Sequence, residues 1–242
     1  MQEDTLKQFL PATESWFRKT FGEPTKIQRE AWPAIADGKH VLVSAPTGTG
    51  KTLSAFLVFI DQLGGLAERG ELKEELYVIY VSPLKSLAGD IRENLRKPLE
   101  GIGAEAHGES KAESRPSNPS IGQIQAAIRT GDTPQKERQR MVKHPPHILI
   151  ITPESLYLML TSKSGRQVLK TAKAIILDEL HALIDTKRGA HLMLSVARLD
   201  KLCGRRLQRI GLSATIEPLE LAAGFLFGSV GGTLLCLVGS LL

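Results

Sequence analysis

Residues 45–52, with the sequence Ala-Pro-Thr-Gly-Thr-Gly-Lys-Thr, combine glycines, a lysine and a hydroxyl in an order that suits phosphate binding. Glycines let the backbone curl so that successive N–H groups face a phosphate chain, and a helix that begins directly after them adds the positive end of its dipole. Lys51 is predicted to reach the terminal phosphates and the Thr52 hydroxyl to ligate Mg²⁺. The strict pattern begins with Gly, and Ala45 is a small departure because Ala needs only an ordinary backbone conformation there. The alternative interpretation is a glycine-rich loop that binds nothing.

Two acidic residues, Asp178 and Glu179, follow the apolar run 174–177. A carboxylate at that place can hold Mg²⁺ together with Thr52, and its neighbour can accept a proton from an attacking water or orient that water. The alternative is a helix N-terminus, where acidic residues interact favourably with the helix dipole. Combined with the glycine-rich loop, the pair predicts the second half of a nucleotide site.

A sheet must position these residues, because apolar runs of strand length alternate with helical segments along the chain. Strands are predicted at residues 41–43, 76–81, 124–128, 147–151, 174–177 and 207–212. Helices are predicted at 6–20, 25–37, 87–95, 134–143 and 156–160, and directly after the glycine-rich loop. Residues 107–120 are polar and rich in turn formers, which predicts a surface loop. The alternation predicts an α/β fold: a parallel sheet with helices on both faces.

The ends of the predicted strands carry small or polar residues. These ends are Ala45-Pro46, Ser82-Pro83, Thr152-Pro153, Asp178-Glu179 and Ser213-Ala214-Thr215. In a parallel sheet they share one edge, where ligands bind. We therefore expect the polar chemistry to gather on that edge.

Composition places the chain among soluble proteins with one core. It has 242 residues, of which 42% are hydrophobic and 5% aromatic, so it can bury one large core or two small ones, mainly aliphatic, and one domain is expected. Cys203 and Cys236 form no CxxC pattern, so neither a disulfide framework nor a zinc site is predicted. This use of cysteine and the charged residues 1–7 fit a cytoplasmic location. The net charge of +5 favours polyanionic partners, although many soluble proteins with such a charge bind none.

Taken in order, the strand-end segments resemble the motifs of superfamily-2 helicases. Residues 21–28 resemble the Q motif, APTGTGKT motif I, SPLKSL motif Ia, TPES motif Ib, DELH the DExH-box motif II and SAT motif III. The wording of PTKIQREAWPAI, PLKSLAGDI and RTGDT is similar to the large-helicase-related (Lhr-like) branch. The resemblance runs from about residue 10 to about residue 228. It implies a P-loop NTPase fold, the first RecA-like domain of an ATP-dependent DNA or RNA helicase, with ATP and Mg²⁺ as cofactors and single-stranded DNA or RNA as partner.

The resemblance also implies residue roles. The catalytic residues would be Lys51, Asp178, Glu179 and His181, the nucleotide would be bound by Gln28, Thr47, Gly48, Thr49, Gly50, Lys51 and Thr52, and the metal by Thr52 and Asp178. Gln28 would read the adenine, Glu179 would be the base, and His181, with Ser213 and Thr215 as partners, would link the ATP state to the nucleic-acid path. The sugar-phosphate backbone would be contacted, without reading of its sequence, by Pro83, Lys85, Ser86, Thr130, Gly131, Thr152 and Pro153.

Three of these assignments have structural alternatives. Gln28 also fits a capping box, as the partner of Thr25. His181 also fits a buried histidine with satisfied hydrogen bonds. For the basic patches 136–143 and 201–209, a solvated face is favoured over a nucleic-acid groove.

The chain departs from the family after motif III. Only 27 residues follow Thr215, so we expect no second RecA-like domain and none of the arginine fingers it would supply. Because such an arginine is worth about 10³ to 10⁵ in rate, this polypeptide alone is expected to hydrolyse ATP poorly and to unwind nothing. The domain is expected to span residues 1–228. The uncharged stretch 221–242 is long enough to span a bilayer, but its glycines disfavour a helix, and a truncated or altered reading frame is favoured for residues 229–242.

Two function classes stay open. One is a DExH-box ATPase domain that drives a motor when a second domain is present. The other is a non-catalytic ATP- and nucleic-acid-binding module from a truncated helicase gene. A P-loop GTPase is disfavoured, because the guanine-reading NKxD motif is absent: the only asparagines, Asn94 and Asn118, are followed by Leu and Pro. DNA and RNA remain equal candidates for the track.

Overall fold

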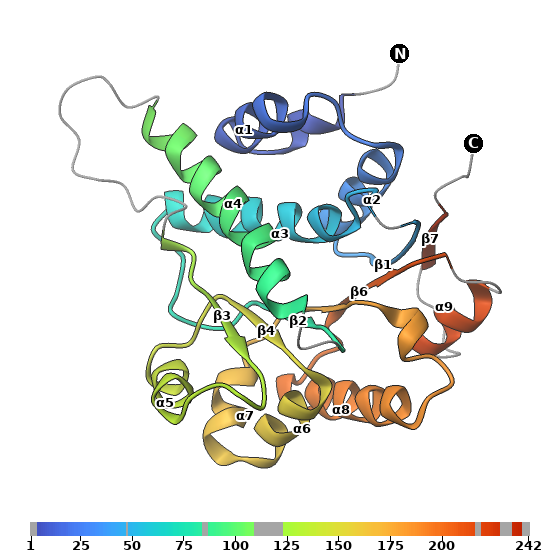
Figure 1. Cartoon of the computed structure of the whole chain (residues 1–242). Coiled ribbons are helices and arrows are strands. Elements are labelled where there is room, and N and C mark those ends of the chain that lie inside the picture. The colour runs from blue at the N-terminus through green and yellow to red at the C-terminus, as the bar shows by residue number, and fades with distance from the viewer. Residues whose placement is uncertain are drawn as a thin grey trace.

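The computed structural model contains one sheet of seven parallel strands in the order β3-β4-β2-β5-β6-β1-β7 (Figure 1). The structure describes residues 4–46, 48–83, 87–108, 123–215, 219–227 and 234–238. The strands are β1 (His40–Ser44), β2 (Val78–Val81), β3 (Ala126–Arg129), β4 (Ile148–Ile151), β5 (Ala174–Leu177), β6 (Gln208–Ser213) and β7 (Leu234–Val238). The predicted parallel sheet is thereby confirmed, and the predicted strands lie within one or two residues of the observed ones.

Helices cover both faces of the sheet and bury two separate apolar cores (Figure 1). One face carries α1 (Pro11–Phe21), α2 (Lys26–Ala36), α3 (Lys51–Glu68) and α4 (Leu87–Gly108). The other carries α5 (Gln135–Lys143), α6 (Pro153–Thr161), α7 (Lys163–Leu169), α8 (Lys187–Cys203) and α9 (Leu219–Phe227). Because both faces are covered, β2, β4 and β5 are buried along their whole length, as their continuous apolar runs predict.

The helix predicted at 6–20 is two elements. Thr5–Gln8 form a 3-10 turn, Phe9 is extended, and α1 begins at Pro11. Proline has no N–H and a fixed φ, which suits the first position of a helix but interrupts one that is already under way. The break lies against α3, where the Leu10 N–H donates to Asp61 Oδ1 at 2.8 Å.

Helix α4 is much longer than the predicted 87–95 and crosses α1 closely. A Cβ on Gly101 would lie 2.0 Å from Nε1 of Trp16, so only glycine allows this approach. The surface loop predicted at 107–120 lies outside the described residues from 109 onward.

The apolar tail contributes an edge strand. β7 pairs in parallel with β1, with Leu234 beside His40 and Val238 beside Ser44. Among the described residues, no helix is both long and apolar enough to cross a bilayer.

Candidate functional site

Every strand points the same way, so the predicted site segments lie at one edge of the sheet. The strand order divides them into two groups. The β5–β6–β1 edge holds residues 44–46, 48–52, 178–181 and 213–215. The β3–β4–β2 edge holds residues 82–83, 130–133 and 152–155. Among the described residues, the predicted nucleotide residues other than Gln28 belong to the first group, and the predicted nucleic-acid residues belong to the second.

The glycine-rich loop joins β1 to α3 in the predicted way. Gly48 and Gly50 have φ of 83° and 81°, in the left-handed region that other residues adopt at a cost. Gly50 is the N-cap of α3, so the loop delivers the chain to a helix N-terminus. Thr49 Oγ1 donates to the Pro46 carbonyl at 2.8 Å and closes the loop on itself. Thr47, predicted as a phosphate ligand, lies outside the described residues.

Gln28 is buried beside the loop and completes the capping box of α2. Its Oε1 accepts from the Thr25 N–H at 2.9 Å, and its own N–H donates to Thr25 Oγ1 at 3.3 Å. A Cβ on Gly50 would lie 2.8 Å from Gln28 Nε2, so a larger residue at position 50 would displace the amide. The capping interpretation is therefore confirmed, and it places the side-chain nitrogen against the loop.

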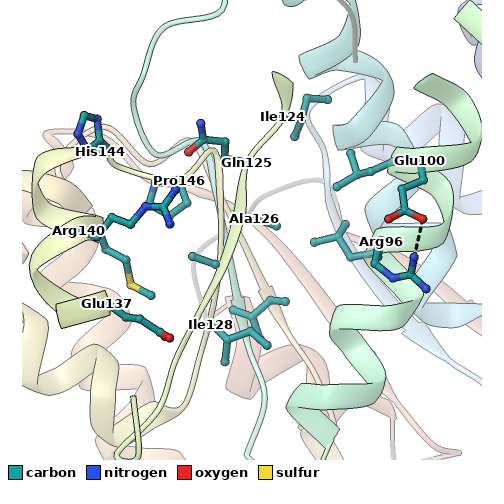
Figure 2. A pocket seen from close by; sticks show the side chains of 15 residues that line it. Arg96, Glu100, Ile124, Gln125, Ala126, Ile128, Glu137, Arg140, His144 and Pro146 are labelled. Carbon is teal, nitrogen blue, oxygen red and sulfur yellow. Dashed lines mark hydrogen bonds and ion pairs between the residues drawn. The ribbon is translucent and has the colours of Figure 1, made fainter. Parts of the chain in front are cut away.

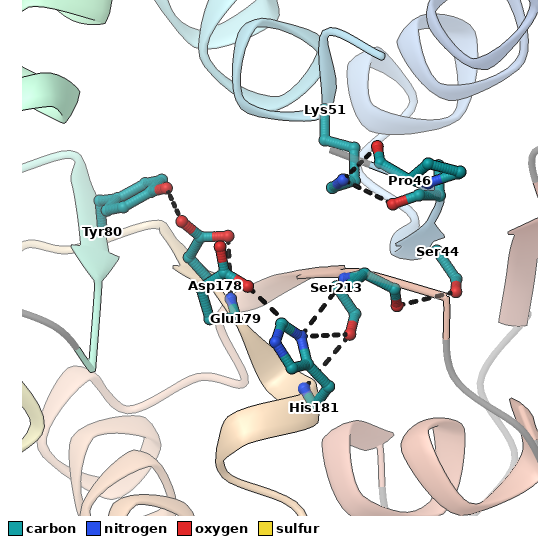
Figure 3. Close-up of polar contacts among 10 residues, drawn as sticks. Ser44, Pro46, Lys51, Tyr80, Asp178, Glu179, His181 and Ser213 are labelled. Atoms are coloured by element: carbon teal, nitrogen blue, oxygen red, sulfur yellow. Dashed lines mark hydrogen bonds and ion pairs between the residues drawn. The ribbon is translucent and has the colours of Figure 1, made fainter. Parts of the chain in front are cut away.

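Lys51 lies between the loop and the acidic pair (Figure 3). Its ammonium donates to the carbonyls of Ala45 at 2.5 Å and Pro46 at 2.6 Å. Burial lowers the pKa of this lysine, while the charges of Glu179 and Asp178 act in the opposite direction. The lysine is thus electrostatically coupled to both carboxylates.

Asp178 directly follows β5 and is only 7% exposed. The Tyr80 hydroxyl donates to its Oδ2, and the Glu179 N–H donates to its Oδ1 at 2.9 Å (Figure 3). Burial raises the pKa of this carboxyl, and the hydrogen bond from Tyr80 partly opposes the rise. Its ionised form is therefore held by directed donors, in a position facing Lys51.

The phenol of Tyr80 lies beside both Asp178 and Thr52. Asp178 accepts a hydrogen bond from it. Burial raises the pKa of Tyr80 strongly, and Thr52 acts in the opposite direction. A hydroxyl and a carboxylate are hard oxygen ligands, and Mg²⁺ typically takes only one or two such ligands from a protein, the rest being phosphate and water. These residues therefore fit Mg²⁺. In the described part of the chain, no group of three His, Cys, Asp or Glu residues is arranged for a metal.

His181 connects the acidic pair to β6. Its N–H donates to Ser213 Oγ at 3.2 Å, and its Nδ1 lies 3.3 Å from both Ser213 Oγ and Glu179 Oε2 (Figure 3). The His181 side chain is 40% exposed, so the alternative of a buried histidine is wrong. Thr215, its other predicted partner, is exposed just beyond β6.

Glu179 has a strained backbone. Its φ of 52° and ψ of 44° lie in the left-handed region, where a non-glycine residue is unusual. Strain of this kind typically costs about 1–3 kcal/mol and clusters at functional sites. The turn is fixed on both sides, by the bond of its N–H to Asp178 and by the 3-10 turn Leu180–Ala182 that follows.

The β3–β4–β2 edge consists of separate turns. Thr152 is the N-cap of α6 and accepts from the Ser155 N–H, with Pro153 at the first helical position. In the turn after β3, Arg138 donates to the Gly131 carbonyl at 2.7 Å, and the Thr130 N–H donates to Thr133 Oγ1 at 2.9 Å. Pro83 follows β2 and is buried. Lys85 and Ser86 lie outside the described residues.

The basic patch 201–209 is partly structural. Arg209 is buried, pairs with Asp200 at 2.6 Å and donates to the Leu226 carbonyl, which ties α9 to β6 and α8. The expectation of a solvated face is therefore wrong for Arg209, because its guanidinium is paired with Asp200 inside the fold. In the patch 136–143, Arg138 is used to brace the turn after β3, as described above.

A cavity of about 710 Å³ lies beside strand β3 (Figure 2). Side chains of α4 and α5 line it, among them Arg96, Glu100, Glu137 and Arg140. It contains none of the predicted site residues.

Two site residues were missed by the sequence analysis. Tyr80 holds Asp178, and Ser44 Oγ donates to the Ala214 carbonyl, which joins the ends of β1 and β6. The only sequence signal for Tyr80 is a phenol inside an otherwise apolar strand, since a buried phenol requires a hydrogen-bond partner.

Comparison with known proteins gives one consistent result. The family model for the DEAD/DEAH box helicase matches residues 25–222. The ATP-dependent helicase Lhr-Core of Methanothermobacter thermautotrophicus is 49% identical over 94% of this chain and 25% of its own length. The Lhr helicase/uracil glycosylase of Escherichia coli is 45% identical over 91% of this chain and 14% of its own.

Among solved structures, Mycobacterium smegmatis helicase Lhr bound to ssDNA and AMP-PNP superposes with a TM-score of 0.86 and 46% identity, over 98% of this chain and 29% of that one. The chain therefore spans between 14% and 29% of the length of these three relatives.

Proposed function

The chain belongs to the DEAD/DEAH box helicase family, and on that premise we propose that it is the first ATP-binding domain of an Lhr-like helicase. In this proposal the domain binds Mg-ATP at the β5–β6–β1 edge and single-stranded DNA or RNA at the β3–β4–β2 edge. A motor needs a second RecA-like domain to close over the nucleotide. The cysteine usage of the chain favours the reducing cytoplasm as its location.

The observation that carries the proposal is that the glycine-rich loop, a helix N-terminus and two carboxylates meet at Lys51. A loop with two left-handed glycines ends in a helix N-terminus, a lysine follows, and both carboxylates act on its charge. A loop that merely turned the chain would need neither the acidic pair nor a strained glutamate beside it. This arrangement favours triphosphate binding over the interpretation of an inert glycine-rich loop.

Each residue at the β5–β6–β1 edge has a definite task in ATP hydrolysis. Lys51 exchanges its two carbonyl partners for oxygens of the terminal phosphates, which offer it a full negative charge. Thr52 and Asp178 would hold Mg²⁺, which would supply positive charge to the phosphates. Glu179 accepts the proton of the attacking water, and its fixed backbone aims the carboxylate.

His181 transmits the state of this site to β6. Its contacts to Glu179 on one side and Ser213 on the other make it the link between the base and the strand end. Movement of the Glu179 carboxylate toward the nucleotide would therefore change the bonds at Ser213. We assign this chain of contacts to the coupling between hydrolysis and nucleic-acid binding.

The β3–β4–β2 edge suits a sugar-phosphate backbone. It offers a helix N-terminus capped by Thr152, together with the exposed turn at Gly131. Such groups bind phosphates without reading bases. The M. smegmatis relative was solved bound to ssDNA, which supports the proposal that this chain binds a single strand. Competition between DNA and RNA strands for binding would identify the natural track.

Titration with a fluorescent ATP analogue in the presence of Mg²⁺ tests the proposal. Lys51→Ala is expected to weaken binding at least about tenfold, because a charge-assisted contact to phosphate is lost. Lys39→Ala is the matched control: it removes an exposed lysine, paired with Asp37, at the opposite end of β1. Equal affinity of the parent and Lys51→Ala would contradict the proposal.

A further inference from the structure

Tyr80 lies on β2 with its side chain on the face of the sheet that α3 covers. In the β2–β5 register Tyr80 pairs with Ile176, and the ladder continues to the bond from the Asp178 N–H to the Val81 carbonyl at 2.9 Å. Side chains two residues apart on a strand share a face. Ile176 and Asp178 therefore project on the same side as Tyr80, which makes Asp178 its diagonal neighbour.

The ring of Tyr80 is fixed. It is fully buried and stacks on Phe56 of α3, with ring centroids 4.8 Å apart and planes inclined by 17°. An aliphatic residue would fill this place in a strand that is otherwise aliphatic. A phenol requires a polar partner there, and the partner it has is the acidic residue of the nucleotide site.

The directions of the hydrogen bonds follow from chemistry. An ionised carboxylate only accepts, so the phenol must donate its one proton to Asp178 Oδ2. The phenol oxygen is then left as an acceptor, and Thr52 lies close enough to lower the pKa of Tyr80, against the rise that burial causes.

We propose that Tyr80 is a positioning residue for the divalent cation that accompanies ATP. Its hydroxyl orients the Asp178 carboxylate, which is one of the two protein ligands expected for that cation, and lies beside the other, Thr52. The inference rests on the proposed function, and it adds that the geometry of the metal site is set from β2, a strand whose end otherwise belongs to the β3–β4–β2 edge. Tyr80 itself touches neither nucleotide nor metal.

The test is metal dependence in Tyr80→Phe, which keeps the ring and its stack but removes the hydroxyl. The matched control is Tyr77→Phe: Tyr77 is also a buried tyrosine, and its oxygen accepts from the Lys73 N–H at 3.2 Å, away from the site. Binding of a fluorescent ATP analogue is titrated with Mg²⁺, and binding of Mn²⁺ to the protein with AMP-PNP is followed by electron paramagnetic resonance. Thermal melting confirms that each variant is folded.

We expect Tyr80→Phe to need about tenfold more Mg²⁺ or Mn²⁺ for half-saturation, since loss of a group that orients metal ligands typically costs 10–100-fold in metal affinity. Nucleotide affinity in EDTA should equal that of the parent, and Tyr77→Phe should match the parent throughout. If Tyr80→Phe does not fold, the variant Phe56→Leu provides the test, because it loosens the packing of the Tyr80 ring but keeps the hydroxyl. A rise in the metal requirement of less than about tenfold then supports the proposal, and no rise overturns it.

The outcomes separate the two proposals. Parent-like metal dependence in folded Tyr80→Phe overturns the inference alone. An equal rise in Tyr77→Phe also overturns it, because the effect would then be a general loosening of β2. A parent chain that binds no nucleotide at any metal concentration overturns the proposed function, and this inference with it.

Discussion

The two halves of the functional edge are built differently. At the β5–β6–β1 edge, side chains bond across the sheet to residues distant in sequence: Tyr80 to Asp178, Ser213 to His181, and Ser44 to the Ala214 carbonyl. At the β3–β4–β2 edge, bonds mostly close within a turn, such as Thr152 to Ser155 and Thr130 to Thr133.

This difference matches the two tasks proposed. Phosphoryl transfer needs a base, a lysine and metal ligands fixed relative to one another, because catalysis depends on positioning and preorganised charge. Holding a strand by its phosphates needs only that each turn presents a donor at roughly the right spacing, since the strand can adapt. The effects of mutations should therefore be non-additive at the β5–β6–β1 edge and additive at the β3–β4–β2 edge.

Glu179→Gln should have the largest effect at the β5–β6–β1 edge, because it removes the base for ATP hydrolysis. Removing the base while keeping the shape and reach of the side chain is expected to lower steady-state phosphate release by about 10²–10⁴-fold. Binding of ATP and of nucleic acid should stay as in the parent, measured beside it by fluorescence titration. Glu137→Gln, an exposed change on α5, is the control. An equal loss of ATP affinity would mean that Glu179 holds the nucleotide rather than activating water.

Hydrolysis by the isolated chain should itself be slow and little stimulated by single strands. Stimulation normally requires a second domain that closes over the nucleotide and supplies an arginine. Rapid, strand-stimulated turnover by the 242-residue chain would show that it obtains a second half by self-association.

The β3–β4–β2 edge should be the salt-sensitive one. Its three turns suggest about three phosphate contacts, so the log–log salt slope for a single strand should be about −2, a loss of about 20-fold in affinity between about 50 and 200 mM salt. Affinity should depend little on base sequence. Anisotropy titrations of labelled homopolymers at the two salt concentrations measure both quantities. A strong preference for one sequence would contradict backbone binding at this edge.

Double-mutant cycles compare the two halves directly. Ser213→Ala and His181→Ala share contacts, so their effects on the free energy of unfolding should be non-additive by about 0.5–3 kcal/mol. Arg138→Ala and Arg188→Ala brace different turns, at Gly131 and Glu154, and should add to within about 0.3–0.5 kcal/mol. Urea unfolding of the four variants and the two doubles provides the values. Equal coupling in both cycles would remove the distinction between the halves.

Sequence predicts what is contiguous. The loop at 45–52 and the pair Asp178-Glu179 could be recognised because each follows an apolar run and carries its chemistry in adjacent residues. The parallel sheet followed from the same runs.

What depends on pairing between distant segments could not be predicted. The role of Tyr80 follows from the register of β2 with β5. The strand β7 depends on its pairing with the side of β1 that β6 leaves open. Helix α8, which packs on α6, is not among the predicted helices, and a solvated face is expected for the patch 201–209 because the ion pair of Arg209 with Asp200 is visible only in the fold. Tertiary context supplied each of these.

The smallest expected effect concerns pH and a buried histidine next to β3. His147 is 5% exposed, and its Nδ1 accepts from the Gln125 N–H at 2.8 Å, so burial lowers its pKa. The unfolded chain then binds a proton at a pH where the folded chain does not, and stability should fall as pH drops below about 6.5. Burial also lowers the pKa of His40, which therefore destabilises the fold in the same pH range. The raised pKa values of Asp61 and Asp178 have the opposite effect at more acidic pH, where they favour the folded state as pH falls.

His147→Asn keeps an acceptor for the Gln125 N–H but does not titrate, so it should flatten the fall in Tm between pH 7.5 and 5.5 by about 2–4 °C, the shift that about 1 kcal/mol gives in a chain of this size. Thermal melts of the parent and of His147→Asn across that range measure the difference. A parental slope in His147→Asn would assign the acid sensitivity to His40, the other histidine whose pKa burial lowers.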